Sequence, residues 1–283
     1  MIEIKKQSLS ETFSVYFDKR MLKIALLGAI SGFPWVLIGS SLSLWLKEDG
    51  LSRSTVGWAG LIFAVYAFNY LWAPLIDRIQ IPYLTKKIGH RRGWIVLMQL
   101  LILISLGLWS VIDPSENLAL VISVGLMIAI ASATQDITVD ALRIEQIGEN
   151  ESRSMAAGAA MAVVGWWSGY KLGGVISLFS AEFLENEGFQ NYWQLTFLIL
   201  GILIILMNIG LMFIHEKDDS TRQKIQNEND KLILSKFNKT NIFTQIITWI
   251  SGTVSGPIIS FFKKNGFQIA LGILGFVFLF KVG

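Results

Sequence analysis

Residues 192–214 read YWQLTFLILGILIILMNIGLMFI and contain no charged side chain. A helix needs about 20 predominantly apolar residues to cross the hydrocarbon core of a bilayer, so this stretch is long enough to span a membrane. Six other apolar stretches have a comparable length: residues 24–46, 56–76, 94–112, 118–141, 155–181 and 267–283. The sequence therefore predicts an all-α integral membrane protein with seven membrane-spanning segments.

The composition supports lipid as the surroundings of these stretches. Of the 283 residues, 53% are hydrophobic and 16% are charged, whereas an ordinary soluble domain carries about 25% charged residues. The apolar residues form long blocks and not the stripes of a soluble amphipathic helix. Because the chain contains no cysteine, a disulfide framework and a cysteine-based metal site are excluded.

The positions of lysine and arginine predict the orientation. Positively charged loops stay in the cytoplasm. With the N-terminus inside, 20 of the 24 basic residues fall in cytoplasmic segments, and only Lys47 and Arg53 fall in loops on the other side. Residues 1–23 have no apolar core and no small-residue cleavage site, so we expect a cytoplasmic N-terminus and not a signal peptide.

The order of the segments predicts one bundle, a linker and part of a second bundle. Residues 24–214 would form a six-helix transmembrane bundle, residues 215–266 a cytoplasmic linker, and residues 267–283 the start of a second transmembrane half. Apolar residues at helical spacing between 233 and 250 predict an amphipathic helix along the inner membrane face. An eighth spanning segment is the alternative. We expect the C-terminal half of a larger transporter to be missing from this chain.

The loop after the second apolar stretch contains a charge pattern typical of a gate. It places Asp77 and Arg78 at a helix end and Arg91 and Arg92 further on, in an arrangement that resembles the inner-loop signature of the major facilitator superfamily. In such a latch, Asp77 would pair with a basic residue at the end of another helix and hold the inner gate in one state. The two candidates for that partner are Arg143 and Arg153. An ordinary basic inner loop is the alternative.

Five motifs in order along the chain resemble one family within that superfamily, the AmpG-type muropeptide permeases. They are Ser31-Gly32-Phe33-Pro34, Leu71-Trp72-Ala73-Pro74-Leu75-Ile76-Asp77-Arg78, Arg91-Arg92-Gly93-Trp94, Ala133-Thr134-Gln135-Asp136-Ile137 with Asp140, and Gly169-Tyr170-Lys171-Leu172. The resemblance implies proton-driven import of anhydromuramyl peptides across the bacterial inner membrane for cell-wall recycling, without a cofactor. Related eukaryotic transporters carry acetyl-CoA, so acetyl-CoA or another organic anion is the alternative substrate.

Two lysines lie inside predicted spans. A charged group in a bilayer helix costs about 2.5–3.5 kcal/mol or more, so it usually faces a cavity and has a function there. Lys171 in the fifth span and Lys281 in the seventh could clamp an anionic substrate between two transporter halves. Alternatively, Lys171 snorkels or pairs with an acid, and Lys281 lies only two residues from the end of the sequence.

Asp136 and Asp140 stand four residues apart and therefore share a face of the fourth span. Neighbouring carboxylates in a medium of low dielectric constant raise each other's proton affinity, which suits proton coupling. Asp136 also lies close to the cytoplasmic end of its helix. A gate salt bridge with Arg143 or Lys171 is therefore an equal alternative for Asp136, and the favoured one for Asp140.

Several aromatic and amide side chains fall at membrane depth. Aromatic rings that face a wet cavity can stack on sugars, and the interfaces where aromatic residues normally gather lie elsewhere. Helix packing is the alternative for each ring. The candidates for substrate contact are Trp35, Trp166, Trp167, Tyr170, Asn69 and Gln135.

Secondary transport is the function class that the sequence favours. His90 and His215 are the only histidines, which removes most histidine-based metal or triad chemistry. No Gly-Lys-Ser/Thr phosphate loop is present, so ATP-driven pumping lacks a motor. A membrane enzyme and a non-transporting sensor or fragment are the other classes. We expect the partners to be a small glycopeptide, protons and the lipid bilayer, with no nucleic acid.

Overall fold

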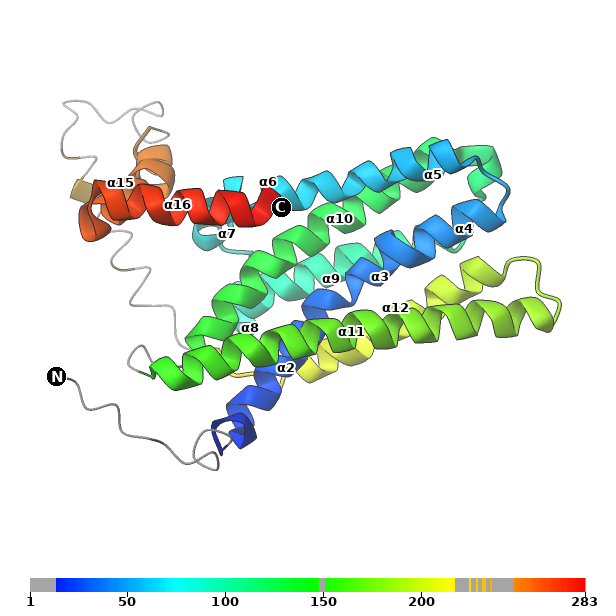
Figure 1. Ribbon diagram of the computed structural model, residues 1–283, viewed down its shortest axis with the longest axis horizontal. Coiled ribbons are helices and arrows are strands. Elements are labelled where there is room, and N and C mark those ends of the chain that lie inside the picture. The colour runs from blue at the N-terminus through cyan, green and yellow to red at the C-terminus, as the bar shows by residue number, and fades with distance from the viewer. Residues whose placement is uncertain are drawn as a thin grey trace. The chain divides into compact units, whose positions relative to one another are not determined.

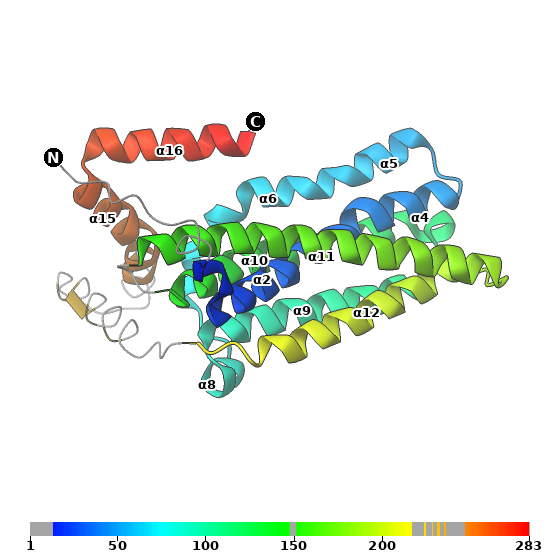
Figure 2. The same ribbon diagram turned by 60° about the horizontal axis from the view of Figure 1, so that its bottom comes forward.

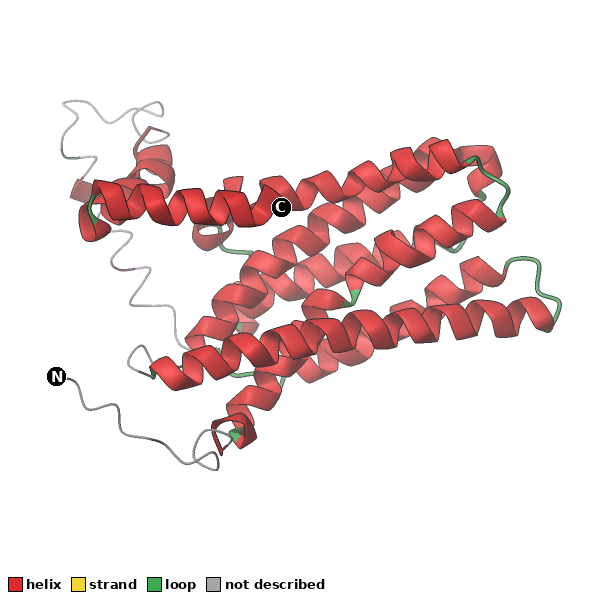
Figure 3. Ribbon diagram, in the orientation of Figure 1, coloured by secondary structure: helices red, strands yellow, loops and turns green. Residues whose placement is uncertain are grey.

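The computed structural model describes residues 14–147, 151–216, 224, 228, 231–232, 235 and 247–282. All of the regular elements in these ranges are helices (Figures 1 and 3). The chain divides into two units. The first is Met1–Tyr66 with Pro82–Glu216, and the second is Ala67–Ile81 with Lys217–Gly283.

Five of the described helical stretches are long and apolar enough to cross a membrane. They are Lys19–Glu48, Arg53–Leu71, His90–Trp109, Pro114–Glu145 and Tyr192–Leu211. α11 (Ser152–Asn186) has 35 residues and is also long enough, but glycines and Lys171 make it less apolar. The all-α membrane fold predicted from the sequence is confirmed.

The first two spans are built from several shorter helices. In the first, the helices are α2 (Lys19–Gly32), α3 (Pro34–Val36), the π-helix η2 (Leu37–Ser41) and α4 (Leu42–Glu48). In the second, they are α5 (Arg53–Ala59), the 3₁₀ helix η3 (Gly60–Ala64), α6 (Val65–Phe68) and the 3₁₀ helix η4 (Asn69–Leu71). The sequence predicted a continuous helix over 56–76. The backbone instead leaves the helical region at Trp72 (φ −105°, ψ 1°), where the following Pro74 favours the start of a new helix.

The other spans of the first unit are less interrupted. They are α9 (His90–Trp109), α10 (Pro114–Glu145), α11 and α12 (Tyr192–Leu211). Two short helices lie before spans: η1 (Val15–Phe17) precedes α2, and α8 (Leu84–Ile88) precedes α9. Buried apolar residues from α2, α9, α10 and the end of the α12 segment form one core. Its members are Leu27, Ile30, Ile95, Val139, Leu142, Leu211 and Ile214.

α2 and α11 are the most closely packed pair of helices in the first unit (Figure 2). Glycines make this approach possible. A Cβ atom added to Gly32 would lie 2.9 Å from Trp166 Cα, and one added to Gly169 would lie 2.8 Å from Ala29 Cα. These neighbours are backbone atoms of the other helix and cannot rotate away. Small residues at such positions let membrane helices gain van der Waals contact along their backbones.

The two ends of the first unit are held by different interactions. At one end, here called the Glu48 end, α4 finishes and α12 begins. Glu48 accepts hydrogen bonds from Trp193 Nε1 (2.7 Å) and Tyr192 OH (3.0 Å). The Trp193 ring belongs to a buried aromatic cluster. The Phe197 ring lies 6.0 Å from the Trp193 ring and 5.0 Å from the Trp45 ring, measured between centroids.

At the opposite end, here called the Glu216 end, a carboxylate caps α9. α9 begins after Gly89 (φ 103°) without a side-chain cap of its own. Glu216 supplies the missing acceptor, because its two oxygens receive the backbone N–H groups of Arg91 (2.7 Å) and Arg92 (3.0 Å). The carboxylate is buried and sits at the positive end of the helix dipole. It therefore fixes the segment after α12 to the start of α9.

The second unit contains α7 (Ala73–Arg78), the π-helix η5 (Ser251–Ser255), α15 (Gly256–Asn265) and α16 (Phe267–Val282). The Arg78 guanidinium joins two of these segments. It donates to Trp249 O (3.1 Å) and to Thr253 Oγ1 (2.9 Å), and it lies 5.4 Å from the centre of the Trp249 ring.

The described end of the linker is helical through the glycine and proline positions 251–257. Most of the predicted amphipathic stretch 233–250 lies outside the described residues, as do the side chain of Lys281 and the whole of residue 283. The division of the chain at 24, 215 and 267 remains a prediction.

We predict that Gly169→Ala separates α2 from α11 and lowers the thermal unfolding temperature, because overpacking costs about 1–3 kcal/mol. The measurement is thermal unfolding of the detergent-solubilised protein followed by tryptophan fluorescence. Gly174→Ala on the same helix is the matched control, since a Cβ there meets nothing within 4 Å. Equal unfolding temperatures for the two variants would contradict the tight contact.

We also predict that Glu216→Ala destabilises the protein by about 1–3 kcal/mol, because one buried and one partly buried backbone N–H group lose their acceptor. Equilibrium unfolding in mixed detergent measures this free energy. Glu185→Ala, at an exposed position on α11, is the control and is expected to change stability by less than about 0.5 kcal/mol. A similarly small change for Glu216→Ala would show that the cap is dispensable.

Candidate functional site

Asp136 lies at a cavity between the first span, α10 and α11. The cavity has a volume of about 350 Å³, and its polar lining includes Ser31, Asp136, Asp140 and Arg143. Ser31 Oγ donates a hydrogen bond of 2.6 Å to Asp136 Oδ1. A carboxylate beside a hydroxyl in an open cavity can bind and release a proton without leaving its place.

The neighbouring predicted residues have separate environments. Asp140 Oδ1 forms an ion pair with Nη2 of Arg143, three residues further along α10, at a distance of 3.1 Å. The Asp140 side chain is 67% exposed. Gln135 is fully buried, and its Nε2 donates to Ile30 O at 2.8 Å, so it joins α10 to α2. Gln135 Oε1 has no hydrogen-bond partner among the described residues. The two aspartates thus share a face as predicted, and both line the cavity.

An aromatic cluster continues from the cavity. Trp166 lines the cavity and meets the Trp35 ring edge-on, at a centroid distance of 5.5 Å. Trp35 also packs against Tyr66 (4.5 Å) and Phe63 (5.0 Å). The Trp35 Nε1–H is buried, and no described residue accepts a hydrogen bond from it. This donor is therefore unsatisfied within the described part of the chain.

Lys171 lies outside the Asp136 cavity, on an exposed face of α11. Its ammonium is 5.5 Å from the ring centres of both Trp167 and Tyr170. Cation–π contacts of this kind stabilise a lysine in a poorly hydrated place. Tyr170 in turn stacks on Trp166 at 5.6 Å, so the rings form a continuous path between Lys171 and the cavity.

The predicted gate residues fall into both units. Arg91 Nε lies 3.3 Å from Glu145 Oε1, and Arg92 Nε lies 4.0 Å from Glu216 Oε2, so both arginines have acidic partners at the Glu216 end of the first unit. Arg153 is exposed at the start of α11. Asp77 and Arg78 belong to the second unit, and so does Asn69, which is buried in η4. A latch between Asp77 and Arg143 or Arg153 remains a prediction.

Sequence reasoning missed most of the acidic partners at this end. Besides Glu145 and Glu216, Arg20 Nη2 pairs with Glu151 Oε2 at 2.9 Å, which joins the start of α2 to the start of α11. The side-chain hydrogen bond from Arg20 also lowers the pKa of Asp18 below its ordinary value. The signal available in the sequence was the position of these acidic residues next to span ends. Such carboxylates normally lie beside a cation or a helix N-terminus.

Comparisons with known proteins agree with this architecture. Residues 24–282 match the family model of the Major Facilitator Superfamily. The chain is 32% identical to a protein named "Putative transporter AmpG 4" of Rickettsia felis over 269 residues, which are 95% of this chain and 58% of that protein. It is 30% identical to "Anhydromuropeptide permease" of Escherichia coli over 196 residues, which are 69% of this chain and 38% of that protein.

A protein of Haemophilus influenzae that is called uncharacterized is 30% identical over 274 residues, which are 95% of this chain and 55% of that protein. The chain thus spans about half the length of the curated relatives that it matches. The resemblance to AmpG-type permeases is confirmed at about 30% identity. Because the family model covers nearly all of the chain, this protein belongs to the Major Facilitator Superfamily, a family of membrane transporters and not of enzymes.

Proposed function

We propose that this chain is part of a proton-coupled secondary transporter that imports anhydromuramyl peptides across the bacterial inner membrane for cell-wall recycling. The observation that carries the proposal is the placement of Asp136, hydrogen-bonded to Ser31, at a cavity lined by an aromatic ring. The likeness to a protein named anhydromuropeptide permease supports the substrate class.

Asp136 is the proton carrier in this proposal, and Asp140 belongs to the gate. The two roles differ because Asp140 forms a salt bridge with Arg143 within α10, whereas Asp136 accepts a hydrogen bond from Ser31 at the cavity wall. Protonation of Asp136 would then alter its hydrogen bond with Ser31 and hence the contact between α2 and α10.

The substrate would lie along the aromatic path. Trp35 offers its unused N–H, while Trp166 and Tyr170 offer ring faces for the sugar. Lys171 would bind a peptide carboxylate at the far end of the path. Asn69, Gln135, Trp167 and Lys281 complete the proposed set of substrate contacts.

The proposed orientation places the Glu216 end in the cytoplasm. Basic residues gather at this end, as the distribution of positive charge in membrane proteins favours, and Arg20, Arg91 and Arg92 are held there by acidic partners. The Glu48 end would then face the periplasm. Asp77 is the proposed latch residue that connects to this charged end when the inner gate is closed.

We predict that Asp136→Asn preserves exchange of a muropeptide across vesicle membranes but abolishes its accumulation, because an amide cannot carry the proton. The measurement is uptake of radiolabelled anhydromuramyl tripeptide into vesicles that contain the protein, with and without a protonophore. Asp49→Asn is the control at an aspartate away from the cavity. Equal loss of exchange and accumulation in Asp136→Asn would assign Asp136 to the gate instead.

We predict that Lys171→Ala abolishes uptake of the same tripeptide while the amount of protein in the membrane is unchanged. Lys171→Arg is the matched variant, since it keeps the positive charge and the cation–π contacts, and it is expected to retain most of the uptake. Unchanged uptake in Lys171→Ala would remove this lysine from the substrate path. If acetyl-CoA and not the tripeptide is taken up, the substrate proposal is wrong and the transporter proposal stands.

A further inference from the structure

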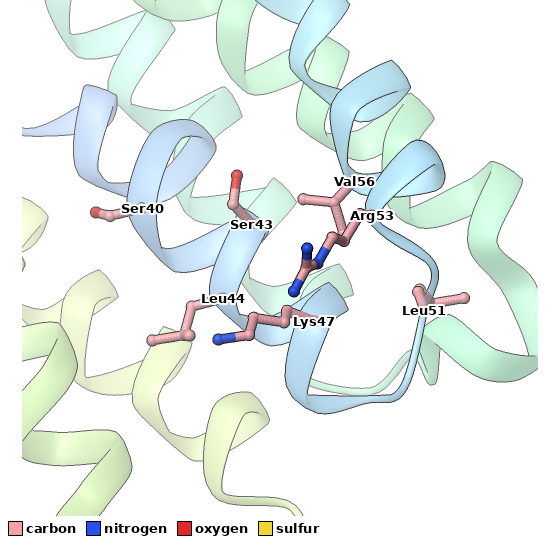
Figure 4. Close-up of a pocket in the computed structure, with 7 residues that line it drawn as sticks. All are labelled: Ser40, Ser43, Leu44, Lys47, Leu51, Arg53 and Val56. Atoms are coloured by element: carbon pink, nitrogen blue, oxygen red, sulfur yellow. The ribbon is translucent and has the colours of Figure 1, made fainter.

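A second cavity lies at the Glu48 end, between α4 and α5 (Figure 4). Its volume is about 360 Å³. Lys47 and Arg53 both line it, together with the hydroxyl-bearing Ser40 and Ser43. These are the two basic residues that the sequence places in loops on the side opposite to the 20 predicted cytoplasmic ones. The fold therefore brings the two outlying cations to one place.

Nearby acids do not neutralise these cations. Within the described ranges, neither Lys47 nor Arg53 forms a salt bridge. The adjacent Glu48 instead accepts from Tyr192 and Trp193 on α12. Two positive charges that share a cavity without a carboxylate favour an anion from solution.

Asp49 is directed elsewhere too. Burial and then the negative charge of Asp113 raise the pKa of Asp49 above its ordinary value. Asp113 itself accepts from the backbone N–H of Ser115 at 2.8 Å. Glu48, Asp49 and Asp113 thus line a different cavity, at the starts of α10 and α12, and leave the α4–α5 cavity positive.

Helix stability does not account for Arg53. It is the first residue of α5, directly after the N-cap Ser52, whose side chain accepts from Thr55 N. A helix N-terminus carries a partial positive charge, so an arginine there is electrostatically unfavourable. A cation in this position without an acidic partner suggests a function outside the helix.

The π-helix in the first span determines which residues line the cavity. In an uninterrupted α-helix, the face of Trp35 would continue through Leu42 and Leu46. Both of these leucines are buried, with exposed fractions of 1% and 0%. The π-helix Leu37–Ser41 adds a residue to one turn. Each residue that shares the Trp35 face beyond this turn is therefore one position later in the sequence than in an uninterrupted α-helix.

After this shift, the face of Trp35 continues through Ser40 and Ser43 to Lys47. Ser40 and Ser43 are half-buried, and Lys47 is exposed. Ser40 Oγ donates to Val36 O at 3.2 Å, an i to i−4 contact within the widened turn. π-helices of a single turn occur frequently at functional sites. Here the widened turn lines up Lys47 with Trp35, whose ring packs against the Trp166 ring of the Asp136 cavity.

We propose that Lys47, Arg53 and Ser43 form a docking site for the carboxylate groups of the substrate at the mouth of the transport path. This inference rests on the proposed function for the identity of the substrate, but not for the presence of an anion site. The exposed cations would capture a peptide carboxylate from the periplasm and pass it along the face of the first span to Trp35. A mouth of this kind raises the rate of association more than the affinity.

The test uses the absence of cysteine from the chain. In Ser43→Cys, the single thiol reports the local charge through its reaction with the anionic sulfonatoethyl and the cationic trimethylammonioethyl methanethiosulfonate. The preference measured is the ratio of the anionic to the cationic rate, divided by the same ratio for a small free thiol. This normalised preference is expected to be about ten, the lower end of electrostatic steering into a charged cleft. In Ser43→Cys with Lys47→Gln and Arg53→Gln this preference should vanish. Leu44→Cys, on the same lining, replaces Ser43→Cys if that variant does not fold.

Asn186→Cys is the matched control, because it is exposed at the end of α11 beside Glu185 and Glu187. It should prefer the cationic reagent, and Lys47→Gln with Arg53→Gln should not alter that preference. Anhydromuramyl tripeptide, but not its methyl ester, is expected to slow labelling of Ser43→Cys. Protection without any uptake into vesicles would keep the docking site and refute the proposed transport.

A Ser43→Cys thiol that shows no preference for the anionic reagent would overturn the proposal. A preference that survives Lys47→Gln with Arg53→Gln would overturn it as well, since the charge would then come from another source. Equal protection by the tripeptide and by its methyl ester would refute the carboxylate as the group that docks.

Discussion

The backbone contact between α2 and α11 is the constraint on which the rest of the site depends. In hydrocarbon, apolar side chains gain little by leaving lipid for protein, so helices associate through close van der Waals contact. Gly32 and Gly169 permit that contact because each lies against backbone atoms of the other helix. The same contact sets the Trp166 ring against Trp35. The aromatic path and the wall of the Asp136 cavity are therefore consequences of glycine packing.

The carboxylates at the Glu216 end and the carboxylate of Asp136 at the cavity have different surroundings. At the Glu216 end, Glu216 caps α9 and Glu145 pairs with Arg91, so positive and negative groups satisfy one another. At the cavity, Asp136 is held by the hydroxyl of Ser31. The Ser31 hydroxyl is a neutral donor, and Asp136 lies at the cavity wall. The carboxylates of the Glu216 end therefore join helix ends, whereas Asp136 faces a cavity and is the candidate proton carrier.

Spans and their approximate limits were predictable, because length and hydropathy alone decide whether a segment such as 192–214 enters lipid. The shared face of Asp136 and Asp140 followed from helical spacing. The Asp140–Arg143 pair was within reach of the same reasoning, since the two stand three residues apart. The Arg91–Glu145 pair was not, because the partners are 54 residues apart and meet only through packing of α9 on α10.

The π-helix is the feature that sequence periodicity could least predict, and it reconciles two demands on one helix. Leu42, Trp45 and Leu46 must face the core, where Trp45 joins the aromatic cluster of the Glu48 end. Lys47 must stay in water, since a cation among those rings would lose its hydration. One extra residue in the turn Leu37–Ser41 lets the half of the span that carries Ser31 and the half that carries Lys47 each meet its own surroundings. The hydrophobic pattern of either half is regular, so the shift between them becomes visible only when both halves are packed.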